Sequence, residues 1–475
     1  MIFSSLVFMC VFLPIVCILY WAAPSLKLKN ALLILASLLF YAYGEPVYVG
    51  LLILSSLLNY FCALGIDKYK EKKKPIMIVA IAVNLGVLAV FKYTGFLIST
   101  CNGAFGTDVP IPEIVMPIGI SFFTFQALSY VVDVYYDKVK AEKSYWVVLL
   151  YISFFPQLIA GPIIKFRDIG EQIRERHHDL KECVHGVRRF VGGLGKKILI
   201  ANTMGLVADT VFSASLTEVN ALTAWLGAIA YMMQIYYDFS GYSDMAIGLG
   251  KLFGFQIKEN FMYPYGVVSI KDFWRRWHMS LSGWFKEYLY IPLGGNRKGR
   301  VRTAVNKMIV FFFTGLWHGA NWTFVIWGLY HGAFLFLEEF VPAIRKLPKV
   351  LGHIYSVLVV CVGFVIFRAD TLMQGLIMIK KMFTDFAMRP EAVSLTVAQL
   401  TPWFLCILIV AVIGAAPIRP VADCIRSHIY HPEMQQDVKW QWVQRALNIM
   451  AVVGLAWCII RLSGGTYNPF IYFRF

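Results

Sequence analysis

Apolar stretches of membrane-crossing length recur along the whole chain, and this pattern constrains the fold more than any other feature of the sequence. A hydrocarbon core of about 30 Å requires roughly 20 predominantly apolar residues per helix. Because 59% of the 475 residues are apolar and only 15% are charged, a set of soluble domains is excluded. We predict an all-α polytopic membrane protein with about 9 to 12 membrane segments, some shorter than a full crossing. The clearest segments are residues 6–23, 31–43, 47–66, 76–91, 116–134 and 145–164.

The formal net charge of +16 is concentrated in short connections between these segments. Lys27 and Lys29, the stretch 67–75 and the stretch 138–143 fall two crossings apart, which the positive-inside rule assigns to the cytoplasm. We therefore predict a multi-pass protein with its N-terminus outside. Since no soluble basic domain presents these charges, we expect no nucleic-acid partner.

The organisation of the chain shows no long repeat and no linker, so we predict one integral-membrane domain over residues 1–475. The nine cysteines form no CxxC pair, and no His/Cys/Asp cluster has the spacing of metal ligands. We expect no metal site and no permanently bound cofactor.

Two apolar segments carry helix breakers. Pro156 and the pair Gly161-Pro162 interrupt residues 145–164, and the following stretch 165–197 has nine Lys or Arg against five Asp or Glu. Since that stretch should also be cytoplasmic, we predict that 145–164 enters the membrane and returns. The run around GLWHGANW is too long for one straight span, and we predict a break near Gly319.

A basic stretch from Lys271 to Lys307 is too charged to cross a membrane and too aromatic for a solvated loop. Aromatic and leucine side chains recur at spacings of three and four in DFWRRWHMSLSGWFKEYLY, which predicts an amphipathic helix at the cytoplasmic interface. Arg275 and Arg276 on this helix suit an anionic donor from the cytosol.

Histidines at membrane depth are costly and therefore indicate function. A neutral imidazole is a competent general base, so His318 is the candidate catalytic residue. For His331 a structural bridge between two helices is the favoured interpretation. No GxSxG, HExxH or Ser-His-Asp motif accompanies them, so a reaction whose substrate brings its own nucleophile fits best, such as a hydroxyl attacking an acyl thioester.

Six longer motifs follow one another along the chain: PIGISFFTFQALSYVVDVY, FFPQLIAGPI, YDFSGYSDMAIGLGKLFGF, DFWRRWHMSLSGWFKEYLYIPLGGNRKG, GLWHGANWTFVIWGLYHG and the ending FIYFRF. These motifs resemble the membrane-bound O-acyltransferase family, and more closely its bacterial alginate O-acetyltransferase branch. They occur in order over residues 117–475, with the densest part at about 117–335, and IPLGGNR followed by GLWHGANW is the most specific.

The resemblance implies a ring of membrane helices around a central tunnel, in a bacterial cell membrane. It places the indispensable histidine at His318 and a second polar residue at His278. It also implies a cytoplasmic donor, acetyl-CoA, a secreted polysaccharide acceptor, and an extracytoplasmic acetyltransferase partner with a Ser/His/Asp site. Further candidates for the donor site or tunnel are Arg275, Arg276, Trp277, Trp317, Asn321 and Gln126.

Two alternatives stay open at this point. D-alanyl transfer to teichoic acid from a carrier protein belongs to the same family and resembles the chain around RRWHMSLSGWF. A polysaccharide exporter or proton-coupled transporter would use His318 as a relay, with Asp238 and Asp244 as the accompanying acids.

Overall fold

The computed structural model describes residues 1–415, 438–465 and 467–471, which are mostly helical and contain no strand. The prediction of an all-α protein is confirmed. The chain folds into two compact units, the first formed by Met1–Phe190 with Met245–Lys258 and the second by Val191–Asp244 with Glu259–Phe475. A single functional domain over the whole chain stays a prediction.

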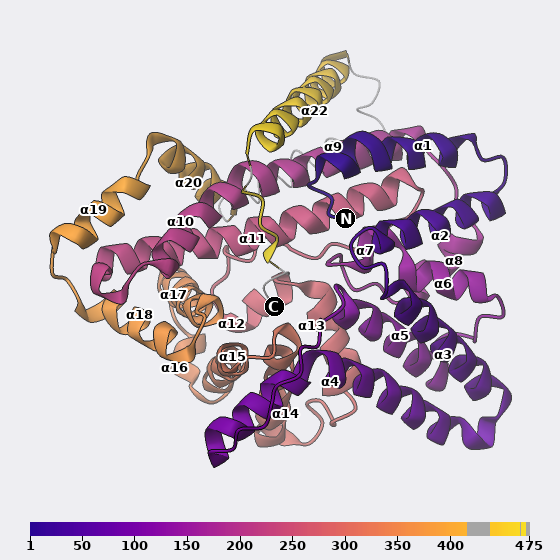
Figure 1. Ribbon diagram of the computed structural model, residues 1–475, viewed down its shortest axis with the longest axis horizontal. Coiled ribbons are helices and arrows are strands. Elements are labelled where there is room, and N and C mark those ends of the chain that lie inside the picture. Colours follow the sequence, from indigo (N-terminus) through magenta and orange to yellow (C-terminus); the bar gives the residue numbers. More distant parts are fainter. Residues whose placement is uncertain (416–437, 466, 472–475) are drawn as a thin grey trace. The chain divides into compact units, whose positions relative to one another are not determined.

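The first unit contains the N-terminal apolar segments. Its helices α3, α4 and α5 pack on one another, and α6 packs on α2, α3 and α8 (Figure 1). Ser25 caps α2 by accepting a hydrogen bond from the Leu28 amide at 3.3 Å. The elements are η1 (Phe8–Phe12), α1 (Leu13–Ala22), α2 (Leu26–Ala42), α3 (Val49–Lys68), η2 (Lys70–Lys72), α4 (Lys73–Phe105), α5 (Ile120–Tyr135), α6 (Tyr145–Ser153), α7 (Phe155–Leu158) and α8 (Phe166–Arg174).

Two long helices contribute residues to both units. The elements that are in neither this pair nor the first unit belong to the second unit. The shared helices are α9 (Leu180–Gly195) and α11 (Ala221–Leu252). The others are η3 (Lys196–Ala201), α10 (Asn202–Ser213), η4 (Leu216–Glu218), α12 (Ile270–Arg276), α13 (Met279–Phe285), η5 (Lys286–Tyr290), α14 (Gly299–His318), α15 (Trp322–Phe340), α16 (Pro342–Arg345), α17 (Lys349–Arg368), α18 (Leu372–Thr384), α19 (Pro390–Gln399), α20 (Pro402–Ala415) and α22 (Val438–Gly464).

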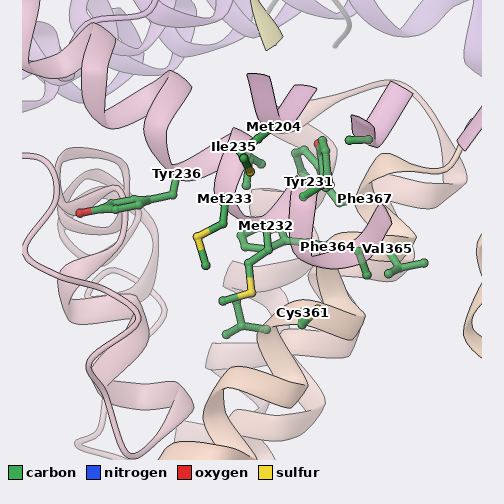
Figure 2. Packing of buried hydrophobic residues seen from close by; sticks show 14 of the residues in the cluster. Met204, Tyr231, Met232, Met233, Ile235, Tyr236, Cys361, Phe364, Val365 and Phe367 are labelled. Carbon is green, nitrogen blue, oxygen red and sulfur yellow. The ribbon is translucent and has the colours of Figure 1, made fainter. Parts of the chain in front are cut away.

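The core of the second unit lies where α11 packs against α10 and α17. Figure 2 shows Met232 and Met233 of α11 beside Phe364 and Cys361 of α17. Methionine adapts to irregular gaps, and the aromatic rings contribute most of the buried area. This core fixes the α17 face that carries Phe364 and Phe367 toward the site described below.

Five helical stretches are long and apolar enough to cross a membrane within the described part of the chain, and the bent pair α19–α20 makes a sixth if counted as one span. Phe8–Ala22 and Ile120–Tyr135 are shorter apolar helices. The expectation of about 9 to 12 segments also counts short and broken segments, which this length criterion leaves out. The five stretches are Val49–Lys68, Lys70–Phe105, Leu180–Ser213, Lys349–Arg368 and Gln441–Gly464.

The predicted interruption of residues 145–164 is confirmed. Helix α6 has nine residues, a length of about 13 Å, which is too short to cross a hydrocarbon core. It ends at Ser153, and the backbone turns at Phe154 (φ −50°, ψ 109°). Pro156 lies in the first turn of the four-residue α7. The return of this segment to the cytoplasmic side stays a prediction.

Candidate active site

His318 is the last residue of α14, at the turn of a helical hairpin. Gly319 has extended backbone (φ −169°, ψ 156°), and α15 begins at Trp322. The side chain of Asn321 caps α15 by accepting from the Thr323 amide at 3.1 Å. The predicted break in this apolar run is therefore confirmed, and it ends α14 at the residue that carries the imidazole.

Two glycines allow α14 and α15 to approach closely. A Cβ atom added to Gly315 would lie 2.3 Å from the carbonyl oxygen of Phe324, and one added to Gly328 would lie 2.2 Å from the carbonyl oxygen of Phe311. Small residues at such positions let helix backbones pack against each other. The glycines in GLWHGANW and VIWGLYHG thus fix the spacing of the hairpin that holds His318.

His278 lies at a break that the sequence did not predict. The expected continuous amphipathic helix over DFWRRWHMSLSGWFKEYLY is wrong, because α12 ends at Arg276 and α13 begins at Met279. His278 itself has φ +43°, in the left-handed region that non-glycine residues rarely adopt. Such strain persists only where surrounding contacts enforce it, and it is common at functional sites.

Asn260 supplies those contacts from an otherwise irregular segment. Its carbonyl oxygen accepts from the Met279 amide at 2.9 Å. Its side-chain Oδ1 accepts from the Ser280 amide at 3.1 Å and from the Ser280 hydroxyl at 2.9 Å, and lies 3.3 Å from His278 Nδ1. Because the Ser280 amide can only donate, the Asn260 atom is an oxygen, and a neutral His278 carries its proton on Nδ1. Nε2 is then the nitrogen with a lone pair.

The structure brings His278 and His318 together as predicted for one reaction site. Both side chains are buried, and their ring centroids are 6.5 Å apart. They line a cavity of about 20 Å³, with room for about one water molecule. Trp317 lies beside both, at 6.0 Å from the His278 ring and 5.0 Å from the His318 ring. The cavity is otherwise lined by Ile235, Phe239, Trp277, Trp327, Phe364, Phe367 and Ile471.

The ring of Trp327 lies between His331 and His318, with ring centroids 5.1 Å from His318 and 5.2 Å from His331. The hydrogen-bonded bridge expected for His331 is not found, because neither ring nitrogen has a partner among the described residues. His331 instead packs against the rings of Phe273 and Trp274.

A larger pocket of about 800 Å³ lies next to Trp274 and is lined by many Lys and Arg side chains. Trp274 lines the pocket and contacts Trp327, the residue next to His318. Thr314, one helical turn before His318, also lines it. The charged side chains around the pocket are Lys271, Arg275, Lys286, Arg297, Arg300, Lys307 and Glu339.

The IPLGGNRKG motif forms the rim of this basic pocket. Gly294, Gly295 and Gly299 have φ of +105°, +57° and +83°, conformations that favour glycine. The Asn306 side chain on α14 donates to the Gly295 carbonyl at 2.9 Å and holds the loop against the helix. The motif therefore shapes the pocket through its backbone.

The remaining candidates take different places. Arg275 lines the basic pocket, whereas Arg276 pairs with Asp272 at 2.9 Å and is not among the lining residues. Asn321 caps α15 and donates to the Asp370 carbonyl at 3.2 Å. Gln126 lies on α5 of the first unit, fully buried, and its amide has no partner within the described ranges.

Sequence reasoning missed Asn260, Phe364, Phe367 and Ile471. Asn260, Phe364 and Phe367 lie outside the motifs given above, and no local pattern marks them. Ile471 belongs to the FIYFRF ending, of which residues 472–475 lie outside the described residues. Its amide donates to Asp238 Oδ2 at 2.9 Å.

Comparison with known proteins decides the family. The family model for membrane-bound O-acyltransferases matches residues 41–369. The chain belongs to the membrane-bound O-acyltransferase family. It is therefore an enzyme, an O-acyltransferase embedded in a membrane, as the sequence motifs predicted.

Some relatives in this family match this chain over the full length of both proteins. The chain is 37% identical to the "Probable alginate O-acetylase AlgI" of Azotobacter vinelandii, with both chains fully covered. It is 31% identical to the peptidoglycan O-acetyltransferase of Helicobacter pylori, covering 100% of this chain and 98% of the relative. Identity to the teichoic acid D-alanyltransferase of Bacillus subtilis is 30%, over 54% of this chain and 70% of the relative.

The transporter alternative depended on two aspartates, and each of them forms an ion pair with a lysine. Asp238 lies 2.7 Å from the Lys197 ammonium, and Asp244 lies 2.6 Å from that of Lys196. A carboxylate held in such a pair is a poor proton relay, since protonation breaks the pair. Membership of the O-acyltransferase family and these pairs both disfavour the transporter alternative.

Proposed function

We propose that this O-acyltransferase takes an acetyl group from a cytoplasmic thioester, acetyl-CoA, and passes it across the membrane for O-acetylation of an extracytoplasmic polysaccharide, as in alginate acetylation. The observation that carries the proposal is the pair His318 and His278 facing one buried cavity, next to a pocket lined by cations. The acetylase names of full-length relatives support acetyl as the group transferred.

The chemistry follows from the two imidazoles. An acceptor hydroxyl attacks the thioester carbonyl carbon, a C–O bond forms and the C–S bond breaks. His318 takes the hydroxyl proton and returns it to the departing thiolate, so the products are an ester and a free thiol. His278, whose Nδ1 proton points to Asn260, uses Nε2 to position the reacting groups. The C-terminal end of α14 stabilises the positive charge that His318 acquires.

The basic pocket is the proposed donor site. Coenzyme A carries several phosphate charges, and charge-assisted hydrogen bonds from Arg and Lys bind phosphates strongly. Arg275, Arg297 and Arg300 line the pocket, and Trp274 lies between it and the histidine cavity. A donor bound there has its charged end among the cations and its thioester directed toward His318.

The acceptor step requires a separate protein in this proposal. The connections predicted to lie outside are short, so this chain has little surface to grip a polymer. The partner would be an extracytoplasmic acetyltransferase with a Ser/His/Asp site. If the purified chain alone acetylated purified polymer, the need for that partner would be refuted.

D-alanyl transfer is the second candidate, because the Bacillus subtilis relative covers about half of this chain. The discriminating experiment offers the purified chain labelled acetyl-CoA or a D-alanyl carrier protein. We expect acyl transfer from the first donor only. Transfer from the carrier protein alone would replace the acetyl proposal with the D-alanyl one.

His318→Ala tests the catalytic assignment. A general base contributes roughly 10²- to 10⁴-fold, so turnover per folded molecule should fall by about that factor, and His278→Ala should have a smaller effect. The matched control is His331→Leu, which removes a buried histidine of the same hairpin. It should lower stability while turnover per monodisperse molecule is kept. Near-wild-type turnover in His318→Ala would remove the assignment.

A further inference from the structure

A second large groove lies in the first unit, whereas the histidine site is formed by residues of the second unit. It has a volume of about 730 Å³ and lies between α2, the start of α6 and the end of α8. Figure 1 shows these three helices close together. Most of its wall is apolar, formed by Leu26, Ala31, Ile34, Leu35, Leu38 and Val147.

The apolar part of the groove has the length of one lipid tail. From Lys27 to Leu38 helix α2 rises about 16 Å, close to half of a hydrocarbon core of about 30 Å. The groove is open to the surroundings, since Leu35 is 55% exposed and Trp146 is 65% exposed. In a membrane protein such a surface is in contact with lipid, and tryptophan is typical of the membrane interface.

The other end of the groove is polar and basic. Lys27 and Arg174 line it together with Ser144. Asn30, one turn after Lys27, donates to the Ile173 carbonyl at 2.7 Å and so holds the start of α2 against the end of α8. The Lys27 ammonium has no ion pair or hydrogen bond within the part of the chain that the structure describes. Arg174 pairs with Glu142 and remains half exposed.

We propose that this groove binds one anionic phospholipid, with a fatty acyl chain along α2 and the headgroup phosphate between Lys27 and Arg174. A phospholipid satisfies both ends of the groove, because its tail covers the leucines and its phosphate neutralises Lys27. The positive-inside rule places Lys27 in the cytoplasmic leaflet, where anionic lipids concentrate and basic pockets between helices bind their headgroups. The site is independent of the histidine cavity and of the proposed function.

Binding of this lipid stabilises the first unit. The groove is built from three segments, namely α2, the start of α6 with the preceding Ser144, and the end of α8. A ligand that contacts all three favours the folded form by mass action. Protein purified with bound anionic lipid should therefore unfold at a higher temperature than delipidated protein.

The test uses the full-length protein in a neutral detergent, titrated with phosphatidylglycerol or with phosphatidylcholine of the same chains. Native mass spectrometry gives an apparent Kd for the first bound lipid. Lys27→Gln should weaken phosphatidylglycerol binding about five-fold, because one Lys near a membrane surface contributes about that factor. The matched control is Lys140→Gln, an exposed lysine outside the groove. Ala31→Trp, which fills the groove, should abolish the tight site.

Several results would overturn the proposal. They are equal phosphatidylglycerol affinity in wild type and Lys27→Gln, equal wild-type affinity for the two lipids, or displacement of the lipid by excess inorganic phosphate. The last result would mean a simple anion site without a role for the groove. If Ala31→Trp is not monodisperse, the comparison of Lys27→Gln with Lys140→Gln decides alone.

Discussion

Gly328→Ala should reduce catalysis although residue 328 does not line the histidine cavity. The added methyl group would lie 2.2 Å from the Phe311 carbonyl oxygen, whereas ordinary contacts begin at 3.4 Å. Helices α14 and α15 must therefore separate by about 1 Å, at a cost of about 1–3 kcal/mol for overpacking. Trp327, the neighbour of Gly328, contacts His318, so the shift is transmitted directly to the imidazole.

A displacement of about 1 Å at a reacting group can cost about 10²-fold in rate. We expect turnover of Gly328→Ala to fall by about that factor. Because Phe311 also lines the basic pocket, donor affinity should fall as well. The assay is labelled acetyl transfer normalised to monodisperse protein, with thermal unfolding measured on the same samples.

The matched control is Gly192→Ala on α9. A Cβ atom there meets nothing within 4 Å, and the residue is an exposed helical glycine. It should gain up to about 1 kcal/mol of helix stability and keep wild-type turnover. If Gly328→Ala retained full turnover per folded molecule, close packing of α14 on α15 would not position His318, and the reasoning would be refuted.

Three further predictions concern the site and the topology. Arg275→Gln should raise the KM for acetyl-CoA about ten-fold with kcat nearly unchanged, since it removes one charged hydrogen bond to the donor. Arg276→Gln should leave KM unaltered, because Arg276 pairs with Asp272, and an equal KM in the two variants would refute a specific donor contact of Arg275. Asn260→Ala should lower kcat about ten- to a hundred-fold. Asn260→Asp should restore most of this kcat and shift the pH–rate profile, because it keeps the oxygen acceptor and adds charge beside His278, and a kcat as low as that of Asn260→Ala would contradict the positioning role. Cysteines introduced in residues 68–74 and 138–143 should resist an impermeant thiol reagent in intact cells, and labelling there would reverse the predicted topology.

The sequence predicted those parts of the fold that depend on local chemistry. The helix break beside His318 follows from glycine, and the break after Ser153 follows from proline, and both are found where these residues occur. Both effects act within a few residues, so they can be recognised without knowing which segments meet.

The break at His278 could not be predicted in the same way. Its flanking residues, in RRWHMSLS, are compatible with a continuous helix, and the aromatic periodicity favours one. The kink depends on Asn260, which lies 18 residues earlier and bonds to both Met279 and Ser280. A contact between distant segments thus overrides a local helical preference.

The same limit applies to the pair of arginines. Arg275 and Arg276 are equivalent by charge and position in the sequence, and both were predicted to contact the donor. In the structure Asp272 lies one turn before Arg276 and binds its guanidinium, whereas Arg275 turns toward the pocket. An i, i+4 pair was visible in the sequence, and it was the available signal that Arg276 already had a partner.

The backbone differs at the two histidines, and this difference is the reason for their proposed roles. His318 ends a 20-residue helix and lies next to the partial negative charge of the helix C-terminus. His278 is held in a left-handed conformation, and Asn260 Oδ1 accepts from its Nδ1. Neutral His278 therefore presents a single nitrogen in a fixed direction. A residue that must gain and lose a proton belongs where positive charge is stabilised, and a residue that must orient a substrate belongs where its own geometry is fixed. On this ground we assign proton transfer to His318 and positioning to His278.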